Sequence, residues 1–211
     1  MTSFVDILRA CPVIPVLVID REEDAVPLAE ALRDGGLTTL EVTLRTPAAL
    51  GAIRRMKSVA GVRVGAGTVL SADDVKRAAD AGSDFLVTPG TSPRLVQPLL
   101  DSGLPAMPGV ATPSEAAARL EEGFPVLKLF PAEQCGGVET LKAWGGPLFN
   151  ALFCPTGGIG RDKVADYLAL KNVVAVGGSW IAPTASVRAG DWSAITENAR
   201  VGAGFGARKT A

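Results

Sequence analysis

Histidine is absent from this 211-residue chain. Its absence removes the commonest general base and the commonest transition-metal ligand together, so any chemistry falls to lysine, glutamate, aspartate, cysteine or tyrosine. The three cysteines, Cys11, Cys135 and Cys154, show no paired spacing typical of a disulfide framework, and they fit a reducing cytoplasm. Aromatic residues make up only 5% of the chain, and the tryptophans are scattered without a stacking stripe, so we assign them to packing.

Long apolar runs and an excess of charge of one sign are also missing. The longest N-terminal apolar run, Cys11 to Ile19, spans nine residues and is too short to cross a bilayer. It also lacks the cationic start and cleavage pattern of a secretory signal, so we predict a buried strand there. A net charge of −1 argues against a nucleic-acid footprint or polybasic membrane attachment. We therefore expect a small-molecule ligand, and neither a nucleic-acid nor a membrane partner.

What the chain does contain is an alternation of apolar runs and helical stretches. Short β-branched runs are each followed by ten to fourteen residues rich in Ala, Leu, Glu, Lys and Arg, which predicts βα units. The expected strands are Val13 to Ile19, Thr39 to Leu44, Val62 to Ala66, Phe85 to Thr88, Pro105 to Pro108, Val126 to Phe130, Phe149 to Cys154 and Val173 to Val176. Helix starts are predicted at Thr46-Pro47, Ser71, Ser92-Pro93 and Thr112-Pro113.

Eight such strands can close into a barrel or lie open as a doubly wound sheet. No Gly-x-Gly-x-x-Gly follows the first strand, and polar residues cluster at the carboxyl ends of many different strands. Both features favour a single α/β domain, a (β/α)8 TIM barrel with a short N-terminal helix. We expect this domain to span residues 1–211, with about 202–211 as a loose tail.

Lys128 stands in the run Pro125 to Pro131, where apolar strand residues flank it on both sides. Side chains alternate between the two faces of a strand, so Lys128 points either into the barrel or into the helix layer. Both environments are poor in water, which favours the neutral amine needed for imine formation. Alternatively, the lysine snorkels to solvent or forms a structural ion pair. Cys154, among apolar residues, is interpreted as a packing residue rather than a nucleophile.

Glu41 and Arg45 share one face of the second expected strand. A carboxylate inside the barrel can shuttle protons, the task that histidine would otherwise perform. Arg45, at the carboxyl end of the strand, can bind a substrate carboxylate through its two-pronged guanidinium. Thr68 ends the third strand and offers a second donor, although it equally fits a turn or a helix cap. The alternative for Glu41 is a structural ion pair with Arg45 or Lys128.

Glycine pairs end the seventh and eighth strands, at Gly157-Gly158 and Gly177-Gly178. Backbone N–H groups of such pairs can cup an anion, a helix N-terminus adds partial positive charge, and barrels commonly bind phosphate in these two loops. Thr156 and Ser179 can add hydroxyl donors. Each pair taken alone is also an ordinary tight turn, but two in the last two loops indicate a phosphate site.

These segments together resemble the 2-keto-3-deoxy-6-phosphogluconate (KDPG) aldolase family, which also includes 4-hydroxy-2-oxoglutarate (KHG) aldolase activity. The resemblance runs from about Val13 to Pro183. The motifs that carry it, specific in this order, are Leu40 to Thr46, Val64 to Leu70, Lys128 to Glu133, Gly136-Gly137, Phe153 to Ile159 and Gly177 to Trp180. One departure is Leu129, where a phenylalanine is common after the lysine.

The resemblance implies a cofactor-free and metal-free lyase of the Entner-Doudoroff pathway, which splits a phosphorylated keto acid into pyruvate and glyceraldehyde 3-phosphate. Lys128 falls on the Schiff-base lysine of the family and Glu41 on its proton-transferring carboxylate. The expected substrate contacts are Arg45 and Thr68 for the pyruvate carboxylate, Gly157, Gly158, Gly178 and Ser179 for the phosphate, and Thr156 for selectivity. The galactonate-derived branch differs at Thr156, which favours the gluconate substrate. The family also implies a homotrimer.

Three other hypotheses stay open from the sequence. An aldolase of the galactonate-derived epimer would use the same residues. A metal-dependent aldolase or phosphosugar isomerase on the same barrel would need zinc ligands from cysteines and carboxylates, at spacings that the chain does not offer. A silent metabolite-binding barrel would keep the phosphate loops, but the presence of both Lys128 and Glu41 speaks against it.

Overall fold

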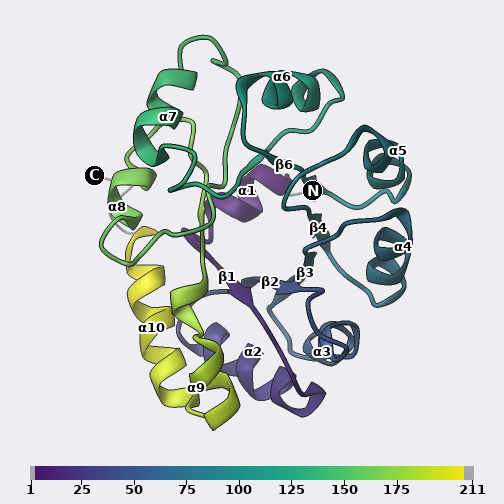
Figure 1. Ribbon diagram of the computed structural model, residues 1–211. Coiled ribbons are helices and arrows are strands. Elements are labelled where there is room, and N and C mark those ends of the chain that lie inside the picture. The colour runs from purple at the N-terminus through teal and green to yellow at the C-terminus, as the bar shows by residue number, and fades with distance from the viewer. Residues whose placement is uncertain (1–2, 207–211) are drawn as a thin grey trace.

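The computed structural model describes residues 3–206, in which helices surround a ring of parallel strands (Figure 1). The strands are β1 (Val13–Leu17), β2 (Thr39–Thr43), β3 (Arg63–Gly67), β4 (Phe85–Val87), β5 (Ala106–Met107), β6 (Gly109–Val110), β7 (Lys128–Leu129) and β8 (Val176–Gly178). The helices are α1 (Phe4–Arg9), α2 (Ala25–Asp34), α3 (Ala49–Met56), α4 (Ala72–Asp80), α5 (Pro93–Asp101), α6 (Pro113–Glu121), α7 (Gly137–Trp144), α8 (Val164–Leu168), α9 (Thr184–Ala189) and α10 (Trp192–Gly204). Two short 3-10 helices, η1 (Glu22–Asp24) and η2 (Ser179–Ile181), complete the set.

Backbone pairing closes the ring. Six parallel strands pair in the order β5-β4-β3-β2-β1-β8, and β6 pairs with β7. β5 and β6 belong to one chain segment that is interrupted at Pro108, which has no N–H to donate. The gap between β7 and β8 is filled by residues 152–156, through parallel bridges of Leu127 with Phe153, Phe153 with Val173 and Thr156 with Gly177. The predicted (β/α)8 barrel is therefore confirmed.

The last two barrel segments differ from the predicted strands. The prediction of a strand from Phe149 is wrong, because residues 145–150 form turns and the Phe149 side chain is 84% exposed. Gly145, Gly146 and Pro147 precede it, and these residues break regular structure. The eighth strand runs over Val176–Gly178 rather than from Val173, which lies in an isolated bridge with Phe153. Apolar runs identified both segments, but turn residues set their limits.

Side-chain capping marks the starts of four described helices, α1, α4, α6 and α10. Ser71 accepts a hydrogen bond from the backbone N–H of Asp74, and Thr112 forms a reciprocal capping box with Glu115, as predicted. The start predicted at Thr46 is wrong, because its hydroxyl donates to the carbonyl of Ile19 and α3 begins only at Ala49.

The predictions for the two ends of the chain have different outcomes. The short N-terminal helix is confirmed as α1. The loose tail predicted from residue 202 is wrong at its start, because α10 continues to Gly204. Residues 207–211 of that predicted tail lie outside the described residues.

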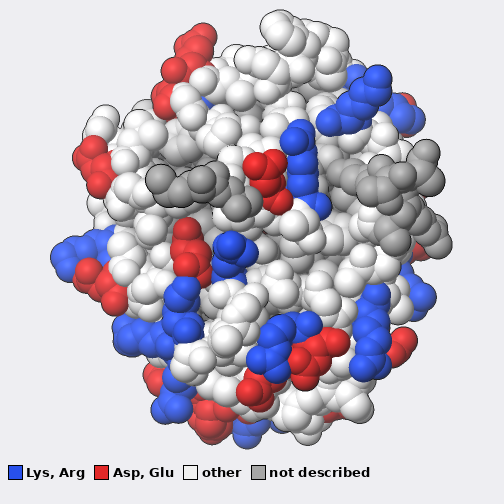
Figure 2. Space-filling view, turned by 180° about the vertical axis from the view of Figure 1, so that it is seen from behind, with Lys and Arg blue, Asp and Glu red and all other residues white. Residues whose placement is uncertain are grey.

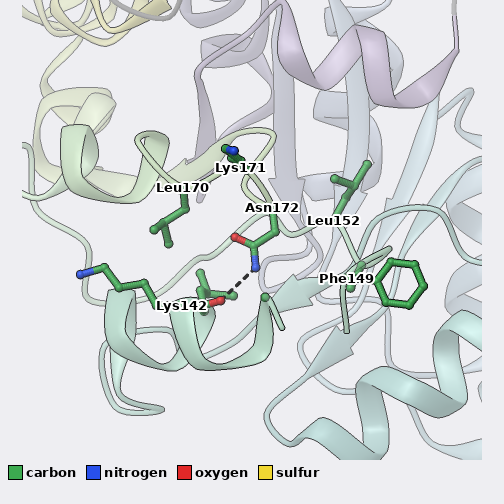
Figure 3. Close-up of a pocket in the computed structure, with 9 residues that line it drawn as sticks. Lys142, Phe149, Leu152, Leu170, Lys171 and Asn172 are labelled. Carbon is green, nitrogen blue, oxygen red and sulfur yellow. Dashed lines mark hydrogen bonds between the residues drawn. The ribbon is translucent and has the colours of Figure 1, made fainter. Parts of the chain in front are cut away.

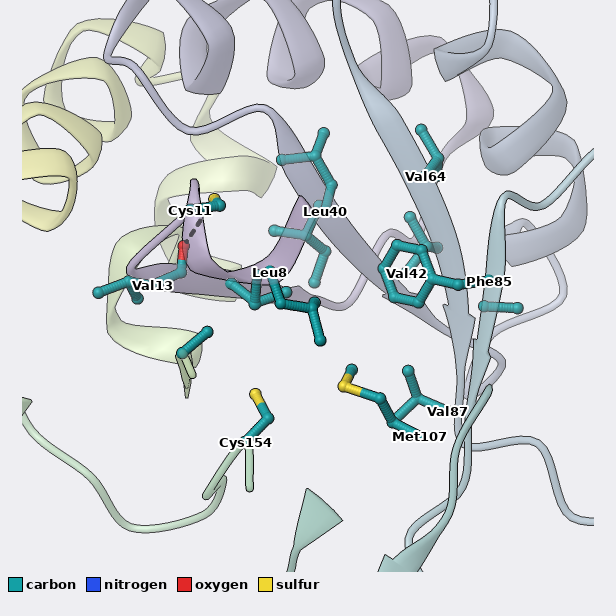
Figure 4. Close-up of a cluster of buried hydrophobic side chains, with 14 of the residues drawn as sticks. Leu8, Cys11, Val13, Leu40, Val42, Val64, Phe85, Val87, Met107 and Cys154 are labelled. Atoms are coloured by element: carbon teal, nitrogen blue, oxygen red, sulfur yellow. Dashed lines mark hydrogen bonds between the residues drawn. The ribbon is translucent and has the colours of Figure 1, made fainter. Parts of the chain in front are cut away.

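Helix α1 precedes β1 and covers the amino-terminal end of the barrel. Its Leu8 is fully buried, and the Phe4 ring centroid lies 5.6 Å from that of Phe85. Figure 4 shows Leu8 converging with Phe85, Met107 and Cys154, which come from different barrel segments. Because this end is filled with apolar side chains, space for a ligand is left at the carboxyl ends of the strands.

The distribution of charged side chains on the described surface agrees with the nearly equal numbers of basic and acidic residues in the sequence. On the face shown in Figure 2, Lys and Arg side chains are interspersed with Asp and Glu side chains rather than gathered into a field of one sign. Within residues 3–206, every helix is too short or too polar to cross a membrane.

Candidate active site

Lys128 and Glu41 meet inside the barrel. The Nζ atom of Lys128 donates a hydrogen bond to Oε1 of Glu41 at 3.0 Å, and the two side chains are 5% and 2% exposed. The lysine therefore points inward from β7 toward β2, and the alternative that it snorkels to solvent is wrong. Its ammonium also lies 5.4 Å from the centre of the Phe130 ring. An amine and a carboxyl group so close together and removed from water can exchange a proton directly.

Gly67 makes room for the Glu41 carboxylate. A Cβ atom at Gly67 would lie 2.2 Å from Oε1 of Glu41, well inside van der Waals contact. Gly65, the first glycine of the Gly-Ala-Gly stretch, similarly accommodates the ring of Phe85. Both glycines in β3 therefore allow another side chain to approach the backbone closely.

A cavity of about 200 Å³ opens at the carboxyl ends of the strands. Its walls are formed by Val16, Arg45, Phe130, Thr156, Gly157, Gly158, Ile159, Gly177 and Ser179. Val16 is the register partner of Glu41, and Phe130 follows Lys128 on the same strand face, so the Lys128–Glu41 pair adjoins this cavity. The volume is small for a drug-sized ligand site and suits a small metabolite.

Arg45 and Thr68 stand together at the rim. The Nε atom of Arg45 donates to the Thr68 hydroxyl oxygen at 3.2 Å. Thr68 has a φ of 58°, a left-handed conformation that costs a β-branched residue roughly 1–3 kcal/mol. The helix cap is Ser71 instead, so the capping alternative for Thr68 is wrong. Strain of this kind clusters at ligand-binding positions, which supports the predicted pair of carboxylate donors.

The predicted phosphate loops line the same cavity. Gly157 and Gly158 have φ values of 106° and 77°, which glycine adopts without strain. At the end of β8, Gly177 and Ser179 line the cavity. Gly178 is instead packed against Val13 and Trp180, because a Cβ atom at this position would contact their side chains. The sequence pattern named the pair without choosing between its members, and the family resemblance named Gly178 rather than Gly177, because the two glycines look alike until the direction of the backbone is known.

Helix ends contribute less to this region than predicted. α8 begins only at Val164, and η2 after β8 spans just Ser179–Ile181. A macrodipole requires several aligned turns, so a three-residue helix supplies little partial charge. Backbone N–H groups of the glycine loops and the Arg45 guanidinium are therefore the main attraction for an anion.

Thr156 and Cys154 lie two residues apart on the seventh barrel segment. Thr156 is buried, and its hydroxyl donates to the Cys154 carbonyl at 3.4 Å, a weak bond that a ligand can replace. Burial, followed by the nearby Glu41 carboxylate, raises the pKa of the Cys154 thiol to about 12. Cys154 is therefore a protonated core residue, which agrees with its interpretation as packing.

A second hollow lies at the other end of the barrel (Figure 3). It is lined by Leu141, Lys142, Gly145, Phe149, Ala151, Leu152, Leu170, Lys171 and Asn172. These residues precede the seventh and eighth barrel segments, so the hollow faces the amino ends of the strands. The side-chain amide of Asn172 donates a hydrogen bond to the Leu141 carbonyl, which connects the loop after α8 to helix α7. Residues at this end of a barrel usually serve stability, and the chemistry is expected at the opposite end.

Comparison with known proteins agrees with this geometry. A family model described as KDPG and KHG aldolase matches residues 4–198. The chain belongs to the KDPG and KHG aldolase family. A 2-dehydro-3-deoxy-phosphogluconate aldolase of Pseudomonas aeruginosa is 47% identical to it, over 94% of this chain and 91% of the relative. The family resemblance predicted from the sequence is thus confirmed.

Two solved structures in the family resemble this chain closely. A KDPG aldolase of Legionella pneumophila, with pyruvate captured at low pH as a covalent carbinolamine intermediate, superimposes with a TM-score of 0.91 at 42% identity, over 94% of this chain and 97% of that one. The 2-keto-3-deoxy-6-phosphogluconate aldolase of Zymomonas mobilis with 3-phosphoglycerate gives 0.90 at 42%, over 97% of each chain.

Proposed function

We propose that this chain is a class I aldolase that reversibly cleaves KDPG to pyruvate and glyceraldehyde 3-phosphate through a Schiff base on Lys128. The observation that carries the proposal is the buried Lys128–Glu41 pair beside a small cavity at the barrel mouth. The pyruvate carbinolamine in the Legionella relative supports the covalent route, and 3-phosphoglycerate in the Zymomonas relative supports a ligand that carries both carboxylate and phosphate.

The proton that Lys128 and Glu41 share starts the reaction. Transfer of a proton from the Lys128 ammonium to the Glu41 carboxylate across their 3.0 Å hydrogen bond leaves the neutral amine that attacks the substrate and a carboxylic acid that can return the proton. The amine attacks the C2 ketone, Glu41 protonates the resulting alkoxide, and loss of water from the carbinolamine gives a protonated imine.

Cleavage follows from the same two groups. The Glu41 carboxylate takes the proton of the C4 hydroxyl, the C3–C4 bond breaks, and its electron pair moves into the imine to give an enamine. The aldehyde leaves, C3 of the enamine is protonated, and water hydrolyses the new imine to release pyruvate and free Lys128. One carboxyl group thus serves as acid and base in turn.

The remaining cavity residues have roles in binding. Arg45 and Thr68 hold the carboxylate of the keto acid, since a guanidinium and a hydroxyl meet at the rim. Gly157, Gly158 and Ser179, with Gly178 through its backbone, hold the phosphate. Thr156 contacts the middle of the substrate and favours the gluconate-derived over the galactonate-derived epimer.

We further propose that residues 1–211 form one catalytic domain of a homotrimer that works in the cytoplasm without a metal or cofactor. Within residues 3–206, no three His, Cys, Asp or Glu side chains lie close enough to hold a metal ion. Cleavage of KHG to pyruvate and glyoxylate is a second activity, because the matching family includes both reactions.

The wild-type protein tests the proposal directly. Incubation with pyruvate and borohydride is expected to trap a mass adduct that maps to Lys128, and a chelator is expected to leave cleavage unchanged. The specificity constant should be highest for KDPG, compared with its galactonate epimer and with KHG. Chelator-sensitive cleavage without an adduct would instead indicate a metal-dependent enzyme. Neither adduct nor cleavage would indicate a silent binding barrel.

The Gly67→Ala substitution tests whether the position of Glu41 matters. The added methyl group overlaps Oε1 of Glu41, so the carboxylate must move, and a displacement of about 1 Å can cost on the order of 100-fold in rate. We expect kcat for KDPG cleavage to fall by roughly 10- to 100-fold. Gly90→Ala is the matched control, because no atom lies within 4 Å of a Cβ at that position. Equal activity of the two variants would show that Glu41 needs no fixed position.

A further inference from the structure

A hydrogen-bonded cluster lies beside the glycine loop of the phosphate site. The Glu133 carboxylate, in the loop that follows β7, accepts a hydrogen bond from the Tyr167 hydroxyl at 2.5 Å and another from the Lys163 ammonium. Tyr167 belongs to α8 and is fully buried. None of the three side chains lines the active-site cavity, and the cleavage chemistry uses none of them.

The backbone beside Glu133 supports the glycine loop directly. The Glu133 N–H donates to the Gly157 carbonyl at 3.1 Å, and the Ala132 N–H donates to the Thr156 carbonyl at 2.8 Å. A Cβ atom at Gly158 would lie 2.9 Å from the Cβ atom of Glu133, so the glycine loop packs against the Glu133 side chain. Two adjacent left-handed glycines have wide conformational freedom, and neighbouring groups must therefore fix the direction of their N–H groups.

The charges of the cluster suit this supporting role. Hydrogen bonds from Lys163 and then Tyr167 lower the pKa of Glu133, so it is ionised at neutral pH. Burial, and then the bond to Glu133, raises the pKa of Tyr167, which stays a neutral donor. An ionised carboxylate beside a phosphate site would repel the ligand, and the Lys163 ammonium offsets that charge.

We propose that Glu133 and Tyr167 are positioning residues that hold Gly157-Gly158 in the form that binds the substrate phosphate. The inference rests on the proposed aldolase function. α8 acts through Tyr167 as a fixed support, Glu133 transmits its position to the loop, and Lys163 neutralises the carboxylate. Loss of the support weakens recognition of phosphate and leaves the reaction at Lys128 intact.

Tyr167→Phe is the sharpest test, because it removes only the hydroxyl group. A hydrogen bond to a charged group corresponds to roughly a tenfold effect or more, so we expect KM for KDPG to rise about tenfold while kcat changes less than about twofold. Inhibition by inorganic phosphate should weaken by a similar factor. The pyruvate concentration that half-saturates borohydride trapping, a reaction without phosphate, should stay within about twofold of wild type.

Two further variants keep the test decisive. Lys163→Gln changes an exposed side chain, so it leaves the fold intact, and it should weaken phosphate inhibition in the same direction. Lys142→Gln removes an equally exposed lysine that is paired with Glu139, and its inhibition by phosphate should equal that of wild type. If Tyr167→Phe and Lys163→Gln leave phosphate inhibition unchanged, or alter pyruvate trapping as much as KM for KDPG, the positioning role is wrong. A wild-type protein without adduct or cleavage would instead refute the aldolase function itself.

Discussion

Lys128→Met is expected to lose both the pyruvate adduct and KDPG cleavage, with a fall in kcat of about ten-thousandfold or more. Methionine keeps the length of the side chain in the buried site but has no amine, so no imine can form. The partner Glu41 is left without its cation, and a buried charge without a partner costs about 3–5 kcal/mol unless the group is protonated. We therefore expect a lower melting temperature but a folded protein.

The measurements for Lys128→Met are intact mass after borohydride trapping, steady-state cleavage of KDPG, and thermal unfolding by circular dichroism. Lys142→Met provides the matched control, because its ammonium is exposed and, among residues 3–206, pairs only with Glu139 on the same helix. The control should retain adduct, activity and stability. Cleavage by Lys128→Met at more than about one hundredth of the wild-type rate would rule out the covalent role of this lysine.

The features predicted well from the sequence are those that a local pattern determines. A lysine inside an apolar strand is costly unless it has a partner or a function, which singled out Lys128. Period-two alternation placed Glu41 on one strand face with Arg45, and left Lys128 pointing either into the barrel or into the helix layer. Their contact joins residues 87 positions apart. Strand patterns alone left the ion pair as one alternative among several, because the contact depends on how the barrel closes.

The features missed from the sequence depend on backbone direction or on distant contacts. The left-handed φ of Thr68 and the choice of Gly177 for the cavity wall follow from how each strand leaves the barrel, which residue type does not encode. Glu133 looks like a surface residue of a loop, because its bonds to Tyr167 and Lys163 span 34 and 30 positions. The exposed Phe149 shows the opposite error, in which apolar character was taken as a sign of burial.

Glu41→Gln is expected to separate the two halves of the reaction that Lys128→Met abolishes together. Glutamine has the size of glutamate and fits beside Gly67, but it cannot take a proton from the C4 hydroxyl. The Lys128 amine is still present in this variant, so pyruvate trapping should persist, although more slowly because Glu41 also assists imine formation. We expect KDPG cleavage to fall by roughly 100- to 10,000-fold, the usual contribution of a positioned general base.

This difference distinguishes a catalytic carboxylate from the structural ion pair that the sequence left open. If the pair only stabilises the barrel, Glu41→Gln should lower the melting temperature while the folded fraction cleaves KDPG at close to the wild-type rate. If Glu41 transfers protons, folded Glu41→Gln protein should still form the adduct but turn over slowly at every pH. Glu139→Gln, at an exposed carboxylate, controls for loss of one negative charge. Because Glu41 is the only carboxylate that hydrogen-bonds to Lys128 among the described residues, no neighbour can take over its role.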